Sequence, residues 1–197
     1  MGHTFPPRHL VTLSDRAGLR HPPALPELVY PDSPALSVMT SFDSVWPVTT
    51  TPDVPIAQAL EAMKGAGVRL LLVRDPDSGI VGVVSAGDLM GERPVRIAEE
   101  LRIPRSEIRV HQVMTPRDAV RVLDLRSVRD ARVGHILATL DALGRQHVLV
   151  VESEEATGAQ TIVGLFSRTH ILRRMSRQPW ESIPAASSLA DMVHPEG

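Results

Sequence analysis

The chain has 197 residues, of which 43% are apolar, and a formal net charge of −2 at pH 7. This length and composition suit one domain or two small ones with a real core, whereas the near-neutral charge argues against a general attraction to nucleic acid or membranes. The sequence has no cysteine, no apolar run near the roughly 20 residues of a membrane helix and no signal-peptide pattern, so we expect a cytoplasmic protein without disulfides or thiolate metal sites.

Residues 1–36 form a proline-rich segment that holds seven of the 17 prolines. No apolar periodicity lasts long enough there to offset the entropy of ordering the chain. We therefore predict an extended N-terminal arm. It is either a loose terminus or a docking arm for another subunit.

Residues 37–92 are predicted to form a first structural repeat. A short strand is expected at 45–51, followed by a helix with Asp53 as candidate cap that ends in the run 65–67. An apolar hairpin follows, with strands at 68–73 and 80–84 joined by a segment whose Asp, Pro, Ser and Gly residues favour a turn. The second strand stops at Ser85 and turns at once into a short helix.

Residues 93–111 are predicted to be a helical linker, with a short helix at 96–102. Ten of the 20 arginines fall between Arg93 and Arg132, and arginine favours bidentate contacts with carboxylate or phosphate. Seven acidic residues, from Glu92 to Asp130, accompany them, which favours a solvated or salt-bridged surface over a phosphate groove.

Residues 112–177 are predicted to form a second repeat. We expect a strand at 120–125, a helix at 133–143, a hairpin with strands at 148–151 and 161–166, and a helix after Ser167. His147 opens the first strand of this hairpin at the position that Arg69 holds in the first repeat. A tail at 178–197 follows, with a candidate short helix at 188–193.

The two repeats share their motifs in the same order. IVGVVSAGDLM at 80–90 returns as IVGLFSRTHIL at 162–172, and Val-Met-Thr occurs at 38–40 and 113–115. The two predicted long helices carry apolar residues at the same relative positions 0, 3, 4 and 7, which lay one stripe along a helix. This doubling in register indicates two copies of one supersecondary unit.

The doubled pattern of VMT, strand, amphipathic helix, apolar hairpin and G-x-x-S-x-x-D resembles the CBS domain, in the tandem pair called a Bateman module. The resemblance covers about residues 37–177. It implies an α/β (α+β) fold of two βαββα repeats packed with pseudo-twofold symmetry around two clefts. Such clefts bind adenine nucleotides or other adenosyl ligands, of the AMP, ADP, ATP or S-adenosylmethionine class, often in energy sensing. It also implies a homodimer formed through the repeats.

The first cleft that the resemblance implies contains Ser85 and Asp88. Their hydroxyl and carboxylate can bind the phosphate or ribose of a nucleotide, although both residues are also favoured as local caps of the helix that begins there. The opposing wall implied by the resemblance consists of Leu125, Gln146, His147 and Val148.

The second cleft departs from the family pattern, because His170 stands where the aspartate is expected. A neutral imidazole accepts one hydrogen bond and cannot accept two from a cis-diol. The other residues expected at this cleft are Val48, Val68, Arg69, Leu70, Ser167 and Arg168. The two arginines favour a more anionic ligand, and the alternative is that this cleft is vestigial.

Nothing in the sequence has the spacing of a catalytic site. We find no nucleophile with a base, no paired carboxylates, no nucleotide-binding glycine loop and no metal-ligand spacing among the eight histidines. We therefore expect a non-catalytic regulatory module without a catalytic cofactor, which binds an adenosyl ligand and acts on a regulated protein that the sequence does not name. The alternatives are a ligand-independent dimerisation scaffold and, with less support, a nucleic-acid binder acting through residues 93–132.

Overall fold

The structure, a computed structural model, describes residues 28–176. Contacts group residues Leu28–Arg177 in one unit. The expected tail at 178–197, its short helix at 188–193 and most of the arm at 1–36 lie outside the described residues.

The first sheet has four strands in the order β2-β3-β4-β5, with β2 parallel to β3 and the other neighbours antiparallel. Five helical segments accompany it. The strands are β2 (Thr49–Thr50), β3 (Leu70–Asp75), β4 (Gly79–Ser85) and β5 (Thr115–Pro116), and the helical segments are α1 (Ile56–Ala66), α2 (Ala86–Met90), α3 (Glu92–Leu101), η2 (Arg105–Glu107) and α4 (Val110–Val113).

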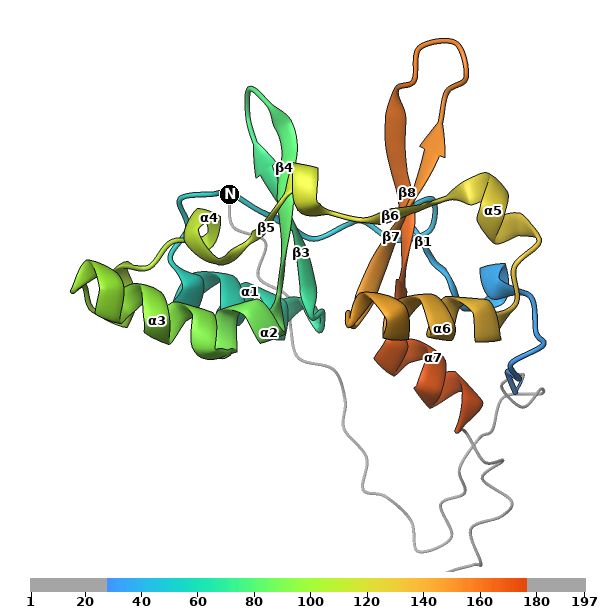
Figure 1. The fold of residues 1–197 in the computed structure, drawn as a ribbon, viewed down its shortest axis with the longest axis horizontal. Helices are drawn as coiled ribbons and strands as arrows, with labels where there is room; N and C mark the ends of the chain where they lie inside the picture. The colour runs from blue at the N-terminus through green and yellow to red at the C-terminus, as the bar shows by residue number, and fades with distance from the viewer. Residues whose placement is uncertain (1–27, 177–197) are drawn as a thin grey trace, which may run out of the picture. The chain divides into compact units, whose positions relative to one another are not determined.

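The second sheet repeats this arrangement in the order β1-β8-β7-β6, with β6 parallel to β7. Its strands are β1 (Thr40–Ser41), β6 (Val122–Asp124), β7 (His147–Ser153) and β8 (Gln160–Ser167), and the helical segments are η1 (Ala35–Val38), α5 (Leu125–Arg129), α6 (Val133–Leu143) and α7 (Arg168–Met175). The short helical segment η3 (Arg117–Ala119) lies in the connector between the sheets and contacts β4 of the first sheet. The predicted mixed α/β class with two repeated units is confirmed (Figure 1).

Each Val-Met-Thr segment leads into an edge strand of one sheet, and the chain then passes to the other sheet. Thr40 of β1 pairs with Leu165 of β8, and Thr115 of β5 pairs with Val83 of β4. Residues 37–41, expected to open the first repeat, therefore complete the second sheet, and residues 112–116, expected to open the second repeat, complete the first. A short apolar strand looks the same in sequence whichever sheet edge it joins, because the long-range path of the chain selects its partner.

The segment 93–111 is part of the first core rather than a separate linker. Its helix is Glu92–Leu101, longer than the expected 96–102. Ile108 and Val110 are fully buried in the same cluster as the residues of α1 and β3. Burial of apolar side chains, and not helix propensity alone, fixes this segment against the first repeat.

The long helix of each repeat packs one apolar stripe against its sheet. In α1 the stripe is Ile56, Ala59 and Met63, and in α6 it is Val133, Ile136 and Leu140, all at most 2% exposed. Both helices end at a glycine in the left-handed conformation, which residues with a Cβ rarely adopt. These two helices confirm the helical spacing in the sequence.

Two local predictions were wrong at the start of the first repeat. The strand expected at 45–51 is reduced to β2, and Trp46 is 95% exposed. Asp53 does not cap α1, since the N-cap is Pro55 without a side-chain hydrogen bond. The fixed φ of proline and the bridge between Pro55 and Arg109 define this helix start.

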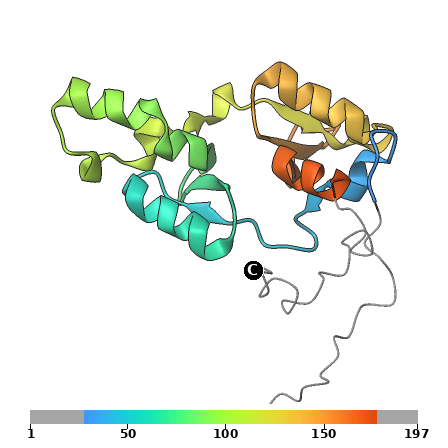
Figure 2. The same ribbon diagram turned by 90° about the horizontal axis from the view of Figure 1, so that it is seen from below.

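Both views of the ribbon show the helices α6 and α7 lying next to each other on the second repeat (Figures 1 and 2). The hairpin β7–β8 ends in its loop on the opposite side from these helices (Figure 1). None of the helices within residues 28–176 is long and apolar enough to span a bilayer.

Candidate functional site

A cavity of about 620 Å³ is lined by residues from both repeats. The first repeat contributes the starts of β3 and α2, the second contributes the turn between α6 and β7, and β5 with the connector after it contributes a third side. The lining residues are Arg69, Leu70, Val83, Ser85, Ala86, Gly87, Asp88, Met90, Thr115, Ala119, Val120, Arg121, Leu143, Gly144, Arg145, Gln146, His147 and Thr169.

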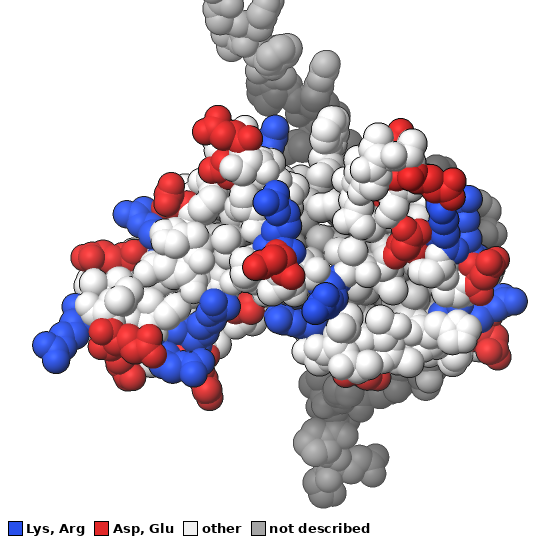
Figure 3. All heavy atoms as spheres, turned by 45° about the horizontal axis from the view of Figure 1, so that its top comes forward, with Lys and Arg blue, Asp and Glu red and all other residues white. Residues whose placement is uncertain are grey.

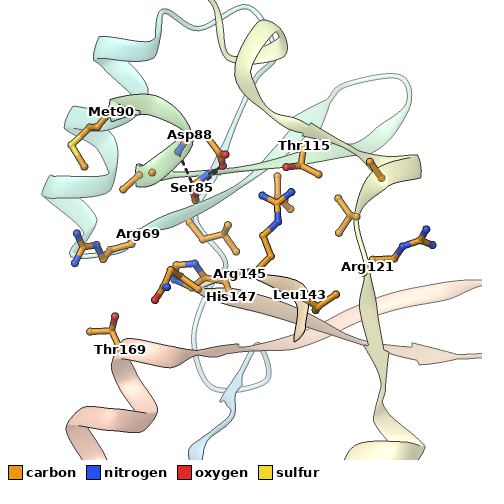
Figure 4. A pocket seen from close by; sticks show the side chains of 18 residues that line it. Arg69, Ser85, Asp88, Met90, Thr115, Arg121, Leu143, Arg145, His147 and Thr169 are labelled. Carbon is orange, nitrogen blue, oxygen red and sulfur yellow. Dashed lines mark hydrogen bonds between the residues drawn. The ribbon is translucent and has the colours of Figure 1, made fainter. Parts of the chain in front are cut away.

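Ser85 and Asp88 form a reciprocal cap at the N-terminus of α2 (Figure 4). The Asp88 Oδ2 atom accepts from the Ser85 backbone N at 2.8 Å and from its hydroxyl at 2.6 Å, while Ser85 Oγ accepts from Asp88 N at 3.2 Å. The local capping role is therefore real. A carboxylate has about four acceptor positions, so Asp88 keeps acceptor capacity for a ligand in the cavity that it lines.

Gln146 and His147 face this cap from the start of β7, and both line the cavity as expected. The pairing of Leu70 with Ser85 and of His147 with Ser167 shows which positions of the repeats correspond. His147 therefore corresponds to Leu70 and not to Arg69, which corrects the sequence alignment by one residue. Periodicity alone did not reveal this shift, because both hairpins consist of continuous apolar runs.

The environment of His147 favours its neutral form. Burial lowers the pKa of the imidazole, the charge of Arg69 lowers it further, and the carboxylate of Asp88 acts in the opposite direction. A neutral imidazole offers one hydrogen-bond donor and one acceptor to a ligand.

Two residues expected in this cleft lie elsewhere. Val148 is 3% exposed and belongs to the second core. Leu125 begins α5, packs against the same core and lines a separate, smaller cavity of about 180 Å³. The alternation of the strand turns Val148 inward once His147 faces the cavity, and β6 ends one residue before Leu125.

The residues expected in the second cleft do not form one site with each other. Arg69 and Leu70 line the cavity described above, while Val48 and Val68 pack against the first core. Ser167 caps α7 by accepting from the His170 backbone N at 3.5 Å, and Arg168 forms an ion pair with Asp141. The guanidinium of Arg168 is thus engaged with a carboxylate of α6.

Sequence reasoning missed several residues of the cavity wall, among them Thr115, Arg121 and Arg145. Thr115 had a signal, since it belongs to the repeated Val-Met-Thr motif. Arg121 and Arg145 had none, because connectors and turns carry arginine in many solvated positions.

The arginine-rich segment 93–132 largely ties the fold together. Four of its ten arginines donate to backbone carbonyls of sequentially distant segments. The pairs are Arg93 with Val113 at 3.0 Å, Arg105 with Leu89 at 2.8 Å, Arg109 with Asp53 at 2.8 Å and Arg132 with Asp32 at 3.2 Å. A fifth, Arg126, pairs with Glu155 at 2.6 Å. Basic and acidic side chains alternate over the visible face in Figure 3. Arg121 differs from these residues because it lines the cavity.

The structure offers no cluster of three or more histidine or acidic side chains suited to a metal ion, as far as residues 28–176 are concerned. The side chains that line the cavity offer hydrogen bonds and charges to a ligand. Their groups are a hydroxyl, a carboxylate, an imidazole, amides and guanidiniums.

Comparison with known families supports the resemblance seen in the sequence. The model of the CBS domain matches residues 29–94. Residues 29–94 of this chain thus match a CBS domain. A comparison with curated proteins found no significant match.

Solved structures share the fold of this chain. An uncharacterized conserved protein from Pyrococcus horikoshii matches with a TM-score of 0.54 and 21% identity, over 76% of this chain and 97% of that chain. A CBS-domain containing protein from Agrobacterium tumefaciens matches with a TM-score of 0.50 and 18% identity, over 70% and 93%. At these identities the likeness shows the tandem fold.

Proposed function

We propose that this chain is a non-catalytic regulatory module that binds an adenosyl ligand in the cavity of about 620 Å³. The observation that carries the proposal is the position of Ser85 and Asp88, which share one wall of that cavity and face His147 on the other (Figure 4), where Gln146 also lines the cavity. The resemblance of both repeats to CBS pairs supports an adenosyl compound as the ligand.

The proposed contacts follow from the capping geometry. Both ribose hydroxyls can donate to the carboxylate of Asp88, of which Oδ2 already accepts from Ser85. A hydrogen bond to an ionised group is stronger than a neutral one. Gln146 and His147 then face the base or the sugar from the second repeat, through their amide and imidazole groups.

Regulation requires that the ligand binds one arrangement of the protein better than another. Typical coupling free energies between two sites are about 1–3 kcal/mol. The cavity meets this requirement in principle, because its walls come from both repeats and from β5. A ligand that contacts all three can therefore favour one relative placement of them.

A thermal-shift panel tests the proposal. AMP, ADP, ATP, NAD, S-adenosylmethionine and cyclic dinucleotides are added to the whole chain, and at least one is expected to raise the unfolding midpoint. Asp88→Asn is expected to remove that shift, since it keeps the size of the side chain but loses its charge. Asp130→Asn, at an exposed position outside the cavity, is the matched control.

A ligand-independent scaffold is the second candidate function. One observation favours it, namely that Ser85 and Asp88 already satisfy each other as a helix cap. A scaffold responds to none of the ligands in the panel. The resemblance also predicts a homodimer for either function, which sedimentation velocity of the whole chain tests: a single species of monomer mass contradicts it.

A further inference from the structure

The cavity carries more positive than negative groups. Its walls include the guanidiniums of Arg69, Arg121 and Arg145 and only one carboxylate, that of Asp88. Within residues 28–176, none of the three arginines forms an ion pair. Unpaired guanidiniums around a hollow attract anionic ligands, and their planar fork suits phosphate.

Arg145 has the most central position of the three. In Figure 4 its side chain rises from the second repeat toward the level of Ser85 and Thr115, whereas Arg69 and Arg121 lie toward opposite ends of the site. A ligand whose sugar is held by Asp88 would therefore meet Arg145 across the cavity. Arg69 and Arg121 add to the positive potential at its two ends.

The positions that correspond to Arg145, Arg121 and Asp88 in the opposite repeats carry neither an arginine nor an aspartate. The register that equates Leu70 with His147 equates Val68 with Arg145, and Val68 packs against the first core. The connector at 42–48 contains no lysine or arginine, whereas its counterpart 117–121 contains two arginines. His170 takes the place of Asp88, three residues after the capping serine.

We infer that the ligand of the cavity carries a phosphate group, that Arg145 binds this phosphate, and that each chain binds one such ligand and not two. The inference rests on the proposed function for the adenosyl part of the ligand. It adds a specificity-determining residue and a stoichiometry. A nucleotide is then preferred over a nucleoside, and over an adenosyl compound with a sulfonium cation in place of the phosphate.

Calorimetric titration of the whole chain with AMP and with adenosine tests the inference. AMP is expected to bind at least about tenfold more tightly than adenosine, at one molecule per chain, because a charge-assisted contact to phosphate is lost in the nucleoside. Arg145→Gln is expected to abolish this preference and leave the affinity for adenosine unchanged. Arg145→Lys keeps the charge and retains part of the preference.

Two further variants separate the contributions. Asp88→Asn is expected to weaken AMP and adenosine by the same factor, because both contain the ribose. Arg126→Gln is the matched control, since Arg126 pairs with Glu155 and does not line this cavity. Its ratio of AMP to adenosine affinity is expected to equal that of the unmodified chain.

The possible failures are distinguishable. Equal binding of AMP and adenosine, an unchanged preference in Arg145→Gln, or two bound AMP molecules per chain overturns the inference and leaves the proposed function intact. Absence of binding for both compounds overturns the proposed function and the inference together. Arg145 is exposed, so its substitution is not expected to unfold the protein.

Discussion

The carbonyl oxygen of Thr115 lies 2.5 Å from the position that a Cβ atom on Gly82 would occupy. Thr40 stands in the same relation to Gly164 of the second sheet, at 2.7 Å. Each glycine thus admits the backbone of a crossing Val-Met-Thr strand, which a side chain would hold away. In each sheet the glycine of the IVG motif therefore contacts the backbone of a VMT motif.

Gly82→Ala is expected to destabilise the protein by about 1–3 kcal/mol, because the added methyl group collides with backbone and cannot be relieved by a rotamer change. Gly65→Ala is the matched control. It lies inside α1 with nothing within 4 Å of the added atom, so a gain of about 0.5–1 kcal/mol is expected from reduced chain entropy. Urea unfolding measures both, and equal stability of the two variants contradicts the crossing contact.

Val38→Ala is expected to cost about 1.5 kcal/mol of unfolding free energy, since two buried methyl groups are lost at about 0.8 kcal/mol each. Val38 is 1% exposed in the second core, although it precedes the first sheet in the chain. Leu36→Ala, at a position that is 41% exposed, is expected to change stability much less. Denaturant titration compares them, and a similar loss in both would show that η1 does not belong to that core.

Ser85→Ala is expected to lower the unfolding free energy by about 1 kcal/mol, the usual cost of losing a helix cap. Ser167→Ala is expected to cost less, because Ser167 accepts a single hydrogen bond at 3.5 Å and Ser85 takes part in a reciprocal pair. Thermal unfolding without ligand provides the measurement. The prediction fails when the two serines prove equally important.

The lowered pKa of His147 predicts a pH dependence of stability. Below its unfolded-state pKa of about 6.5, the unfolded chain binds more protons at this site than the folded one, so stability falls as the pH decreases from 7 toward the lower folded pKa. His147→Gln is expected to remove this part of the slope. An NMR titration of the imidazole checks the cause directly, and a midpoint at or above 6.5 rules it out.

The repeated sequence motifs predict the main helices and hairpins of this protein. Periodicity located α1 and α6, the hairpins β3–β4 and β7–β8 were legible from apolar runs and turn residues, and Ser85 marked the start of α2. These features depend on neighbours a few residues away in the chain. A single sequence carries much of that information, although it did not give the extent of β2 or the cap of α1.

Contacts between distant segments were decided only by the tertiary structure. The chain path selects the sheet edge that each Val-Met-Thr strand joins, turns Val148 into the core, and brings Arg145 and Thr115 to the same cavity as Asp88. Local sequence patterns report which face of an element is buried, but not which remote surface covers it. The site depends on both kinds of information. The cap formed by Ser85 and Asp88 is encoded locally, whereas the side chains that face it come from the opposite repeat.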